Sequence, residues 1–270
     1  MAPWPARVDT SRKRVRIVSA VILAPPVLAA IYFGTPYMEI FILGAGAIVA
    51  WEWARLCGGG EITPPGWLAV GAVLSALLAA GLGHYAVAMA IAGLAALGLA
   101  GWLLFGRSPA AIWLPSGVVY LVAAGLGLLF LRDRPEDGWR IIYWLLAVVW
   151  ATDTGGYVAG RTLGGPKLAP TVSPNKTWSG LAGAMLAAGL VGGVVASFWP
   201  GWDALTMGLA SLGLALVAQA GDLFESRLKR RFGAKDSSHL IPGHGGLLDR
   251  VDGVLSVGLV VSLVIWWTGR

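Results

Sequence analysis

Long apolar runs recur along nearly the whole 270-residue chain, and they limit its fold more than any other feature. A helix of about 20 apolar residues crosses the hydrocarbon core of a bilayer. Backbone N–H and C=O groups find no water in lipid, so such runs form helices rather than open sheets. Only 13% of the residues are charged, against about 25% in a typical soluble domain. The sequence therefore predicts an all-α, polytopic integral membrane protein.

Nine apolar runs predict nine membrane spans. They cover roughly residues 17–34, 37–56, 67–83, 85–105, 112–131, 140–159, 178–199, 204–224 and 251–268. The third and fourth runs nearly meet at Gly83-His84, so two full spans or one re-entrant pair would fit there. We find no soluble domain and treat residues 1–270 as a single integral membrane domain.

The basic residues predict the orientation of the bundle. Loops on the cytoplasmic side of a membrane carry an excess of Lys and Arg. With nine spans and a cytoplasmic N-terminus, only four of the 20 Lys and Arg lie outside, namely Arg132, Arg134, Arg140 and Arg270. The net charge of +6 then reflects topology and attraction to anionic headgroups, and it does not indicate nucleic-acid binding.

Acidic residues from three spans converge on the predicted cytoplasmic face. Asp153 lies near the end of the sixth span, Asp222 near the end of the eighth, and Asp249 and Asp252 at the start of the ninth. Charged residues at membrane depth are costly and often functional, although structural ion pairs remain an alternative. Carboxylates from neighbouring helices suit Mg²⁺, which fills its other positions with water and phosphate oxygens. Glu39 and Glu52 are isolated, and no role is assigned to them.

Basic residues alternate with these acids in two cytoplasmic loops. Residues 221–253 hold six Lys or Arg, five Asp or Glu and two His, and residues 161–179 hold two more lysines. Lys and Arg are the usual ligands of triphosphate oxygens. A Gly-His-Gly-Gly turn at 243–246 can present N–H groups to phosphate at a helix N-terminus. One helical face carries Gln219, Asp222, Ser226 and Arg230. The pattern indicates a site for a cation and a polyphosphate, with a purely topogenic basic cluster as the alternative.

The segment 226–252 resembles the signature of the phosphatidate cytidylyltransferases, or CDP-diacylglycerol synthases. It contains Ser226-Arg227-Leu228-Lys229-Arg230, then Lys235-Asp236, and then His244-Gly245-Gly246-Leu247-Leu248-Asp249-Arg250-Val251-Asp252. Upstream, Asp153–Tyr157 and Ser173–Thr177 resemble two other polar segments of that family. Ser179 departs from the family, in which Glu is expected after Trp178. The resemblance is specific for about the last half of the chain.

The resemblance implies transfer of a cytidylyl group from CTP to phosphatidic acid, giving CDP-diacylglycerol and pyrophosphate for phospholipid biosynthesis. It implies Mg²⁺ on Asp222 and Asp249, with Asp153 and Asp252 as further candidate ligands and room for a second cation. Candidate catalytic residues are Asp222, Asp249, Lys235 and Asp236. Candidate substrate-binding residues are Ser173, Asn175, Lys176, Thr177, Ser226, Lys229, Arg230, His244, Gly245, Gly246 and Arg250.

The same resemblance implies a role for each half of the chain and a cellular location for the protein. Residues 1–140 supply N-terminal transmembrane helices, and residues 141–270 form the catalytic half. The expected partners are CTP, phosphatidic acid and the lipid bilayer, without nucleic acid, and a homodimer is left open. The expected location is a bacterial inner membrane, with the site facing the cytoplasm.

Three other functions remain to be distinguished from this one. A CTP-dependent lipid kinase and a CDP-archaeol-type synthase would use similar nucleotide chemistry on a different reaction or lipid. A transporter would place charges near the membrane midplane and break helices in two paired halves. The acidic residues here gather at one face, and no inverted repeat is visible, so the pattern favours an enzyme.

Overall fold

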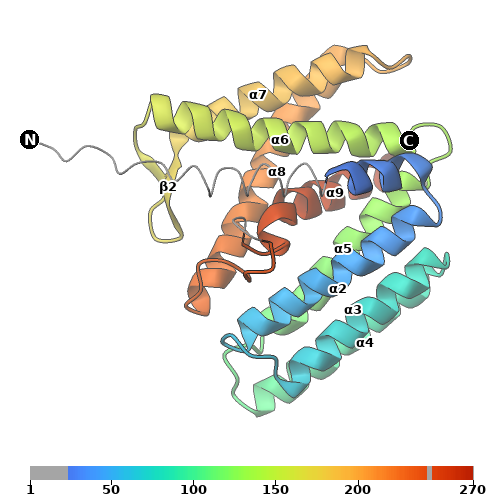
Figure 1. Cartoon of the computed structure of the whole chain (residues 1–270), viewed down its shortest axis with the longest axis vertical. Helices are drawn as coiled ribbons and strands as arrows, with labels where there is room; N and C mark the ends of the chain where they lie inside the picture. The colour runs from blue at the N-terminus through green and yellow to red at the C-terminus, as the bar shows by residue number, and fades with distance from the viewer. Residues whose placement is uncertain (1–23, 242–244, 270) are drawn as a thin grey trace, which may run out of the picture.

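The computed structural model describes residues 24–241 and 245–269, and most of them are helical (Figure 1). A short apolar helix, Ala24–Phe33, comes first. The elements after it are α2 (Tyr37–Cys57), α3 (Pro64–Gly81), α4 (Tyr85–Phe105), α5 (Trp113–Arg132), α6 (Gly138–Thr162), β1 (Lys167–Ala169), β2 (Ser173–Thr177), α7 (Trp178–Ser197), α8 (Ala204–Arg231) and α9 (Leu248–Thr268). Within the described residues, the eight helices α2 to α9 are long and apolar enough to cross a membrane.

These helices confirm eight of the nine predicted spans and the predicted all-α fold class. Part of the first predicted span, 17–34, lies outside the described residues, and the rest is the helix Ala24–Phe33. The re-entrant alternative at Gly83-His84 is wrong, because α3 and α4 are separate helices of 18 and 21 residues. Helices of that length reach about 27–32 Å, which is enough to span the membrane.

Helix α8 continues to Arg231, seven residues beyond its predicted end at 224. The apolar pattern stops there, but the polar residues that follow are good helix formers. Lys229, Arg230 and Arg231 lie in its last turn, where positive charge interacts favourably with the helix dipole. The last seven residues of α8 therefore hold these charged side chains on a rigid helix, beyond the apolar run, rather than on a loop.

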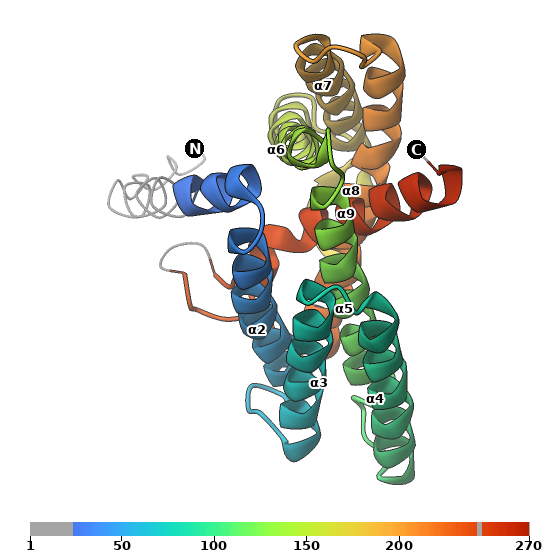
Figure 2. The ribbon, with the colours of Figure 1, turned by 90° about the vertical axis from the view of Figure 1, so that its right-hand side faces the viewer.

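The helices form two groups that α9 connects. One group contains α2, α3, α4 and α5, and the other contains α6, α7 and α8 (Figures 1 and 2). Helix α6 packs along α7, and α7 packs along α8. Helix α9 contacts α5 and α2 from the first group and α8 and α6 from the second. The start of α9 is therefore positioned by both halves of the chain.

Small residues allow α6 and α7 to approach closely. A Cβ atom added to Gly155 of α6 would lie 2.4 Å from Ala187 Cβ, and one added to Gly183 of α7 would lie 2.2 Å from Ala159 Cβ. Helices in membranes associate through such small-residue contacts, because lipid provides no hydrophobic force between them. This close contact fixes the end of α6, which carries Asp153, beside the start of α7.

Gly183→Ala is therefore expected to destabilise the protein, since the new methyl group has no space at the α6–α7 contact. Overpacking of this kind costs roughly 1–3 kcal/mol. The matched control is Gly213→Ala on α8, where an added Cβ would meet nothing within 4 Å. Thermal unfolding in detergent should show a lower midpoint for Gly183→Ala only. Equal midpoints for the two variants would contradict the close packing.

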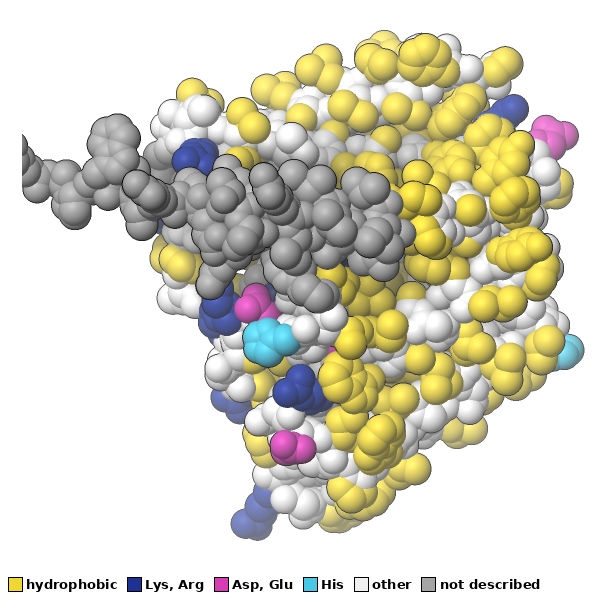
Figure 3. Space-filling model, in the orientation of Figure 1, with side chains coloured by type: hydrophobic (Ala, Val, Ile, Leu, Met, Phe, Trp, Pro, Cys, Tyr) yellow, Lys and Arg dark blue, Asp and Glu magenta, His cyan; other side chains and the backbone are white. Residues whose placement is uncertain are grey.

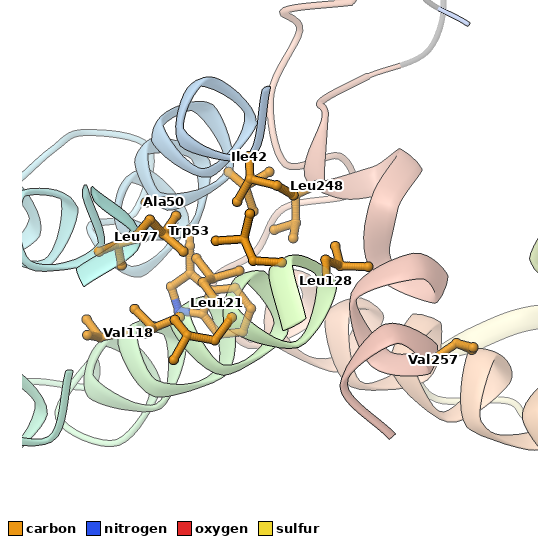
Figure 4. Packing of buried hydrophobic residues seen from close by; sticks show 14 of the residues in the cluster. Ile42, Ala50, Trp53, Leu77, Val118, Leu121, Leu128, Leu248 and Val257 are labelled. Carbon is orange, nitrogen blue, oxygen red and sulfur yellow. The ribbon is translucent and has the colours of Figure 1, made fainter. Parts of the chain in front are cut away.

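The apolar core joins the start of α9 to α2 and α5. Figure 4 shows Leu248, the first residue of α9, in one cluster with Ile42 and Trp53 of α2 and Leu121 of α5. Leu248 is almost completely buried. Burial of a large aliphatic side chain contributes about 1.5–3 kcal/mol, so this contact anchors the first turn of α9.

Charged side chains gather on one side of the molecule. In Figure 3, most of those that this face exposes lie along the left edge, with a smaller group at the right edge and apolar side chains between them. The left edge is where Figure 1 shows the end of α6, the β1–β2 hairpin and the end of α8. The predicted convergence of polar residues from separate spans on one side is thus found in the fold.

Candidate active site

Asp222 of α8 forms the centre of a first, partly open cluster. Its Oδ2 atom lies 2.6 Å from Lys176 Nζ, and its Oδ1 accepts a hydrogen bond from Ser226 Oγ at 3.2 Å. The side chain of Asp222 is 35% exposed. Lys176 belongs to β2 and Ser226 to the next turn of α8, so the cluster joins the hairpin to the helix and leaves the carboxylate accessible.

A second cluster, more deeply buried, surrounds Lys229 one turn further along α8. Lys229 Nζ lies 2.7 Å from Glu225 Oε1 and 2.6 Å from Asp249 Oδ1. The three side chains are only 13%, 3% and 5% exposed. Buried charges are stable only when they are paired and hydrogen-bonded. One ammonium group here contacts two carboxyl groups, one on its own helix and one on α9.

The other oxygen of Asp249 is held by the segment that precedes α9. Asp249 Oδ2 accepts hydrogen bonds from Ser237 N at 2.9 Å, Ser237 Oγ at 3.0 Å and Gly246 N at 2.9 Å. With Lys229 on Oδ1, the carboxylate has four partners. Its position is therefore fixed by Lys229 of α8 and by Ser237 and Gly246 of the loop before α9.

Asp153 and Asp252 complete the acidic group. The carboxylates of Asp153, Asp222 and Asp252 lie close enough to repel one another. Asp252 Oδ1 accepts a hydrogen bond from the N–H of the adjacent Gly253, and Asp153 is also near Lys176 and Arg250. Asp153, Asp222 and Asp252, from three different helices, therefore lie near one another.

The two described glycines of the turn before α9 leave room for the carboxylates. Gly245 has φ +84°, and a Cβ on it would lie 2.8 Å from Asp249 Oδ2. A Cβ on Gly246 would lie 1.9 Å from Ser237 Oγ and 2.4 Å from Glu52 Oε1. The N–H of Gly246 donates to Asp249, so in this structure that amide is engaged within the protein rather than free for phosphate.

Gly246→Ala is accordingly expected to displace Ser237 or the Glu52 carboxylate and to lower turnover strongly, by roughly a hundredfold, the upper range for loss of an outer-shell partner. Gly71→Ala on α3 is the control, because an added Cβ there would meet nothing within 4 Å. Initial rates of the reaction proposed below, measured on detergent-purified protein, provide the comparison. Wild-type rates in Gly246→Ala would show that the turn tolerates a side chain.

The β1–β2 hairpin positions Lys176 and begins α7. Its strands pair antiparallel, with Lys167 opposite Thr177. Thr177 is buried, and its Oγ1 caps α7 by accepting from Gly180 N at 3.1 Å. Ser179, at the position where the family is expected to have Glu, donates a hydrogen bond to the Gly164 carbonyl. In this chain Ser179 therefore connects the start of α7 to the preceding loop and contributes no charge.

Most of the remaining predicted site residues are exposed. Exposed ones are Asn175, Arg230, Lys235, Asp236 and Arg250, and Ser173 is half-buried. Arg230 donates to the Ala234 carbonyl at 3.0 Å, which closes the turn after α8. His244 lies outside the described residues. The structure thus brings Lys176, Asp222 and Ser226 together at one point and Lys229 and Asp249 at another.

Two acidic residues of the site were not predicted. Glu225 shares Lys229 with Asp249, and Glu52 of α2 accepts four hydrogen bonds from the loop that holds Asp249. Glu52 is a carboxylate within an apolar segment, which is by itself a sign of function. That signal was available for Glu52, but its partners lie almost two hundred residues away in the chain.

The donor set can accommodate a hard cation. Among the described residues there is no preassembled group of three or more His, Cys, Asp or Glu side chains that could hold a metal ion. Mg²⁺ needs only one or two protein carboxylates when water and phosphate oxygens supply the rest. Asp222 is accessible and has the carboxyl groups of Asp153 and Asp252 nearby, so its environment fits such an ion.

Together, the fold and the site define a polytopic helical membrane protein with an acid–lysine centre at one end of the bundle. The cytidylyltransferase family matches residues 14–268. The chain therefore belongs to the cytidylyltransferase family.

Individual relatives agree with this assignment. A phosphatidate cytidylyltransferase of Brucella suis is 38% identical over 261 residues, covering 94% of this chain and 93% of the relative. One from Pseudomonas aeruginosa is 35% identical over 270 residues, covering 94% and 97%. One from Rickettsia bellii is 41% identical over 145 residues, covering 51% and 62%. The similarity to the first two extends over nearly the whole membrane bundle.

Proposed function

We propose that this protein transfers a cytidylyl group from CTP to phosphatidic acid, producing CDP-diacylglycerol and pyrophosphate. The observation that carries the proposal is the centre formed by Asp222, Lys176, Lys229 and Asp249 on one side of a membrane bundle. Its carboxylates and ammonium groups have the chemistry needed to bind a cation and a triphosphate. Family membership and the names of the relatives support the same reaction.

The reaction needs positioning and charge stabilisation more than proton transfer. A non-bridging oxygen of the lipid phosphate attacks the α-phosphorus of CTP. The new P–O bond forms as the bond to the oxygen of the β-phosphate breaks, and pyrophosphate leaves with that oxygen. A phosphate monoester is already ionised near neutral pH, so no general base is required, and fixed charges lower the barrier.

The protein's own residues would hold the reactants in place. Asp222 would hold Mg²⁺, with Asp153 and Asp252 nearby, and Asp249 would join it by exchanging a present contact for the ion. The ion when bound would neutralise triphosphate charge. Lys176 enters from the hairpin and is oriented by Asp222. Arg230, Lys235 and Arg250 are exposed and would contact phosphate oxygens. These residues would align the two phosphates while the fixed charges reduce their repulsion.

The place of the centre suits one soluble and one lipid substrate. It lies where α6 and α8 end and α9 begins, the side to which the basic residues assign the cytoplasm. CTP would reach it from that aqueous side. Phosphatidic acid would arrive laterally, with its headgroup at the membrane surface and its chains against the exposed apolar side chains of the bundle.

The test uses detergent-purified protein with phosphatidic acid, Mg²⁺ and CTP labelled separately on its α- and γ-phosphates. Label from the α-phosphate should appear in lipid, with release of pyrophosphate. Label from the γ-phosphate in lipid would instead identify a CTP-dependent kinase. No transfer of either label by folded protein, with several phospholipid acceptors tried, would refute nucleotidyl transfer and reopen the transporter alternative.

A further inference from the structure

Glu52 is a completely buried carboxylate whose hydrogen bonds all go to one distant segment. It lies near the end of α2 and is 0% exposed. Its four donors, which lie 185 to 196 positions later in the chain, are Ser237 Oγ at 3.3 Å, Ser238 Oγ at 2.5 Å, Leu247 N at 2.9 Å and Leu248 N at 2.6 Å. Within the described part of the chain, no Lys or Arg forms an ion pair with it. A carboxylate buried in this way is stable only because those hydrogen bonds are made.

Two of these donors are backbone amides at the start of α9. The first N–H groups of a helix have no partner within the helix. Helix α9 has no side-chain cap of its own at Leu247, and Glu52 accepts from the amides of Leu247 and Leu248 instead. A carboxylate at a helix N-terminus also interacts favourably with the helix dipole. Glu52 therefore caps α9 from a different helix.

The segment held by Glu52 is also the segment that holds Asp249. The single hydrogen of the Ser237 hydroxyl is shared between Glu52 Oε2, 3.3 Å from Oγ, and Asp249 Oδ2, 3.0 Å from Oγ. Gly246 donates to Asp249, and its missing side chain leaves space for Glu52. Asp249 itself lies in the first turn of α9, directly after the amides that Glu52 binds. Any shift of the Glu52 carboxylate would therefore move the groups that orient Asp249.

We propose that Glu52 is a positioning residue of the active site. It fixes Ser237, Ser238 and the first turn of α9, and through them the direction of the Asp249 carboxylate. The N-terminal half of the chain thereby contributes to a centre whose other described charged residues all come from residues 153–252. The proposal rests on the proposed function only for its kinetic readout, since the structural link is present without substrate.

The test compares Glu52→Gln with Glu39→Gln, the same substitution near the other end of α2. The Gln side chain keeps the shape of Glu, but its NH₂ group cannot accept the hydrogen bonds that the donors around Glu52 now make. In Glu52→Gln, hydrogen exchange at residues 237–252 without substrate should accelerate about tenfold, as for loss of one hydrogen bond. With substrates, kcat should fall about a hundredfold while KM for CTP changes little, because transition-state alignment is lost. Glu39→Gln should match the wild type in both.

Two results would overturn the proposal. The first is wild-type exchange and kcat in Glu52→Gln. The second is faster exchange throughout α2, α5 and α9 with unchanged kcat, which indicates general destabilisation only. If Glu52→Gln cannot be recovered folded, Ser238→Ala takes its place, because it removes one donor to Glu52. Ser238→Ala should lower kcat less than Glu52→Gln and should accelerate exchange locally, at 237–252. Wild-type kcat and exchange in Ser238→Ala would also overturn the proposal. Absent cytidylyl transfer by wild type would refute the proposed function without changing the exchange result.

Discussion

Asp249→Asn protein is expected to insert into the membrane but to lose about a thousandfold in kcat/KM, the range found when one strong transition-state contact is removed. Asp249 binds Lys229 through one oxygen and three donors through the other. An Asn amide must turn its NH₂ group toward either Lys229 or those donors, so hydrogen bonds on that side are lost. The lost charge also removes a proposed Mg²⁺ ligand. Initial rates of CDP-diacylglycerol formation give the measurement.

Asp133→Asn is the control for this prediction. Asp133 lies just after α5, is exposed, and accepts a hydrogen bond from Tyr85 at 2.8 Å. Its substitution removes a carboxylate from the same protein without touching the proposed site. Activity near the wild-type value is expected for Asp133→Asn. Full activity in Asp249→Asn would remove Asp249 from both metal binding and catalysis.

Lys229→Met is expected to have the largest effect on stability, together with loss of activity. The substitution leaves Glu225 and Asp249 buried and only 3% and 5% exposed without the cation that both contact. Removing one partner of a buried charge pair destabilises a protein by about 3–5 kcal/mol. Thermal unfolding in detergent should therefore show a much lower midpoint than that of the wild type.

A second variant separates charge from packing in this prediction. Adding Glu225→Gln to Lys229→Met removes one of the two uncompensated carboxylates, so part of the lost stability should return while activity stays low. Arg227→Met, an exposed position on the same helix, should change the midpoint little. If Lys229→Met unfolds like the wild type, the buried cluster of Lys229, Glu225 and Asp249 is wrong.

Much of the fold could be predicted because it depends on local patterns. Each apolar run specifies its own helix, since lipid leaves no other way to satisfy the backbone. Alternating direction through the bundle then brings Asp222 and Asp249 to one side. The strands of the hairpin were not predicted, because Ser173–Thr177 has neither alternating apolar residues nor several β-branched ones.

The contacts within the site could not be predicted in the same way. Lys229 was expected to bind phosphate, but it pairs with Asp249 twenty positions later, and this depends on how the loop after α8 folds back. Glu52 was assigned no role because its partners are separated from it by most of the chain. Spacing along one helix indicates which residues share a face, whereas contacts between distant segments need the packed structure.

The most direct test of the central claim is to follow oxygen from the lipid phosphate. Phosphatidic acid with ¹⁸O in its three non-bridging phosphate oxygens would be incubated with CTP, Mg²⁺ and purified protein, and the products analysed by mass spectrometry. Attack of the lipid phosphate on the α-phosphorus predicts CDP-diacylglycerol that keeps all three ¹⁸O atoms, and pyrophosphate that contains none. Heavy oxygen in pyrophosphate, or a lipid product that gains only a phosphate group, would contradict cytidylyl transfer.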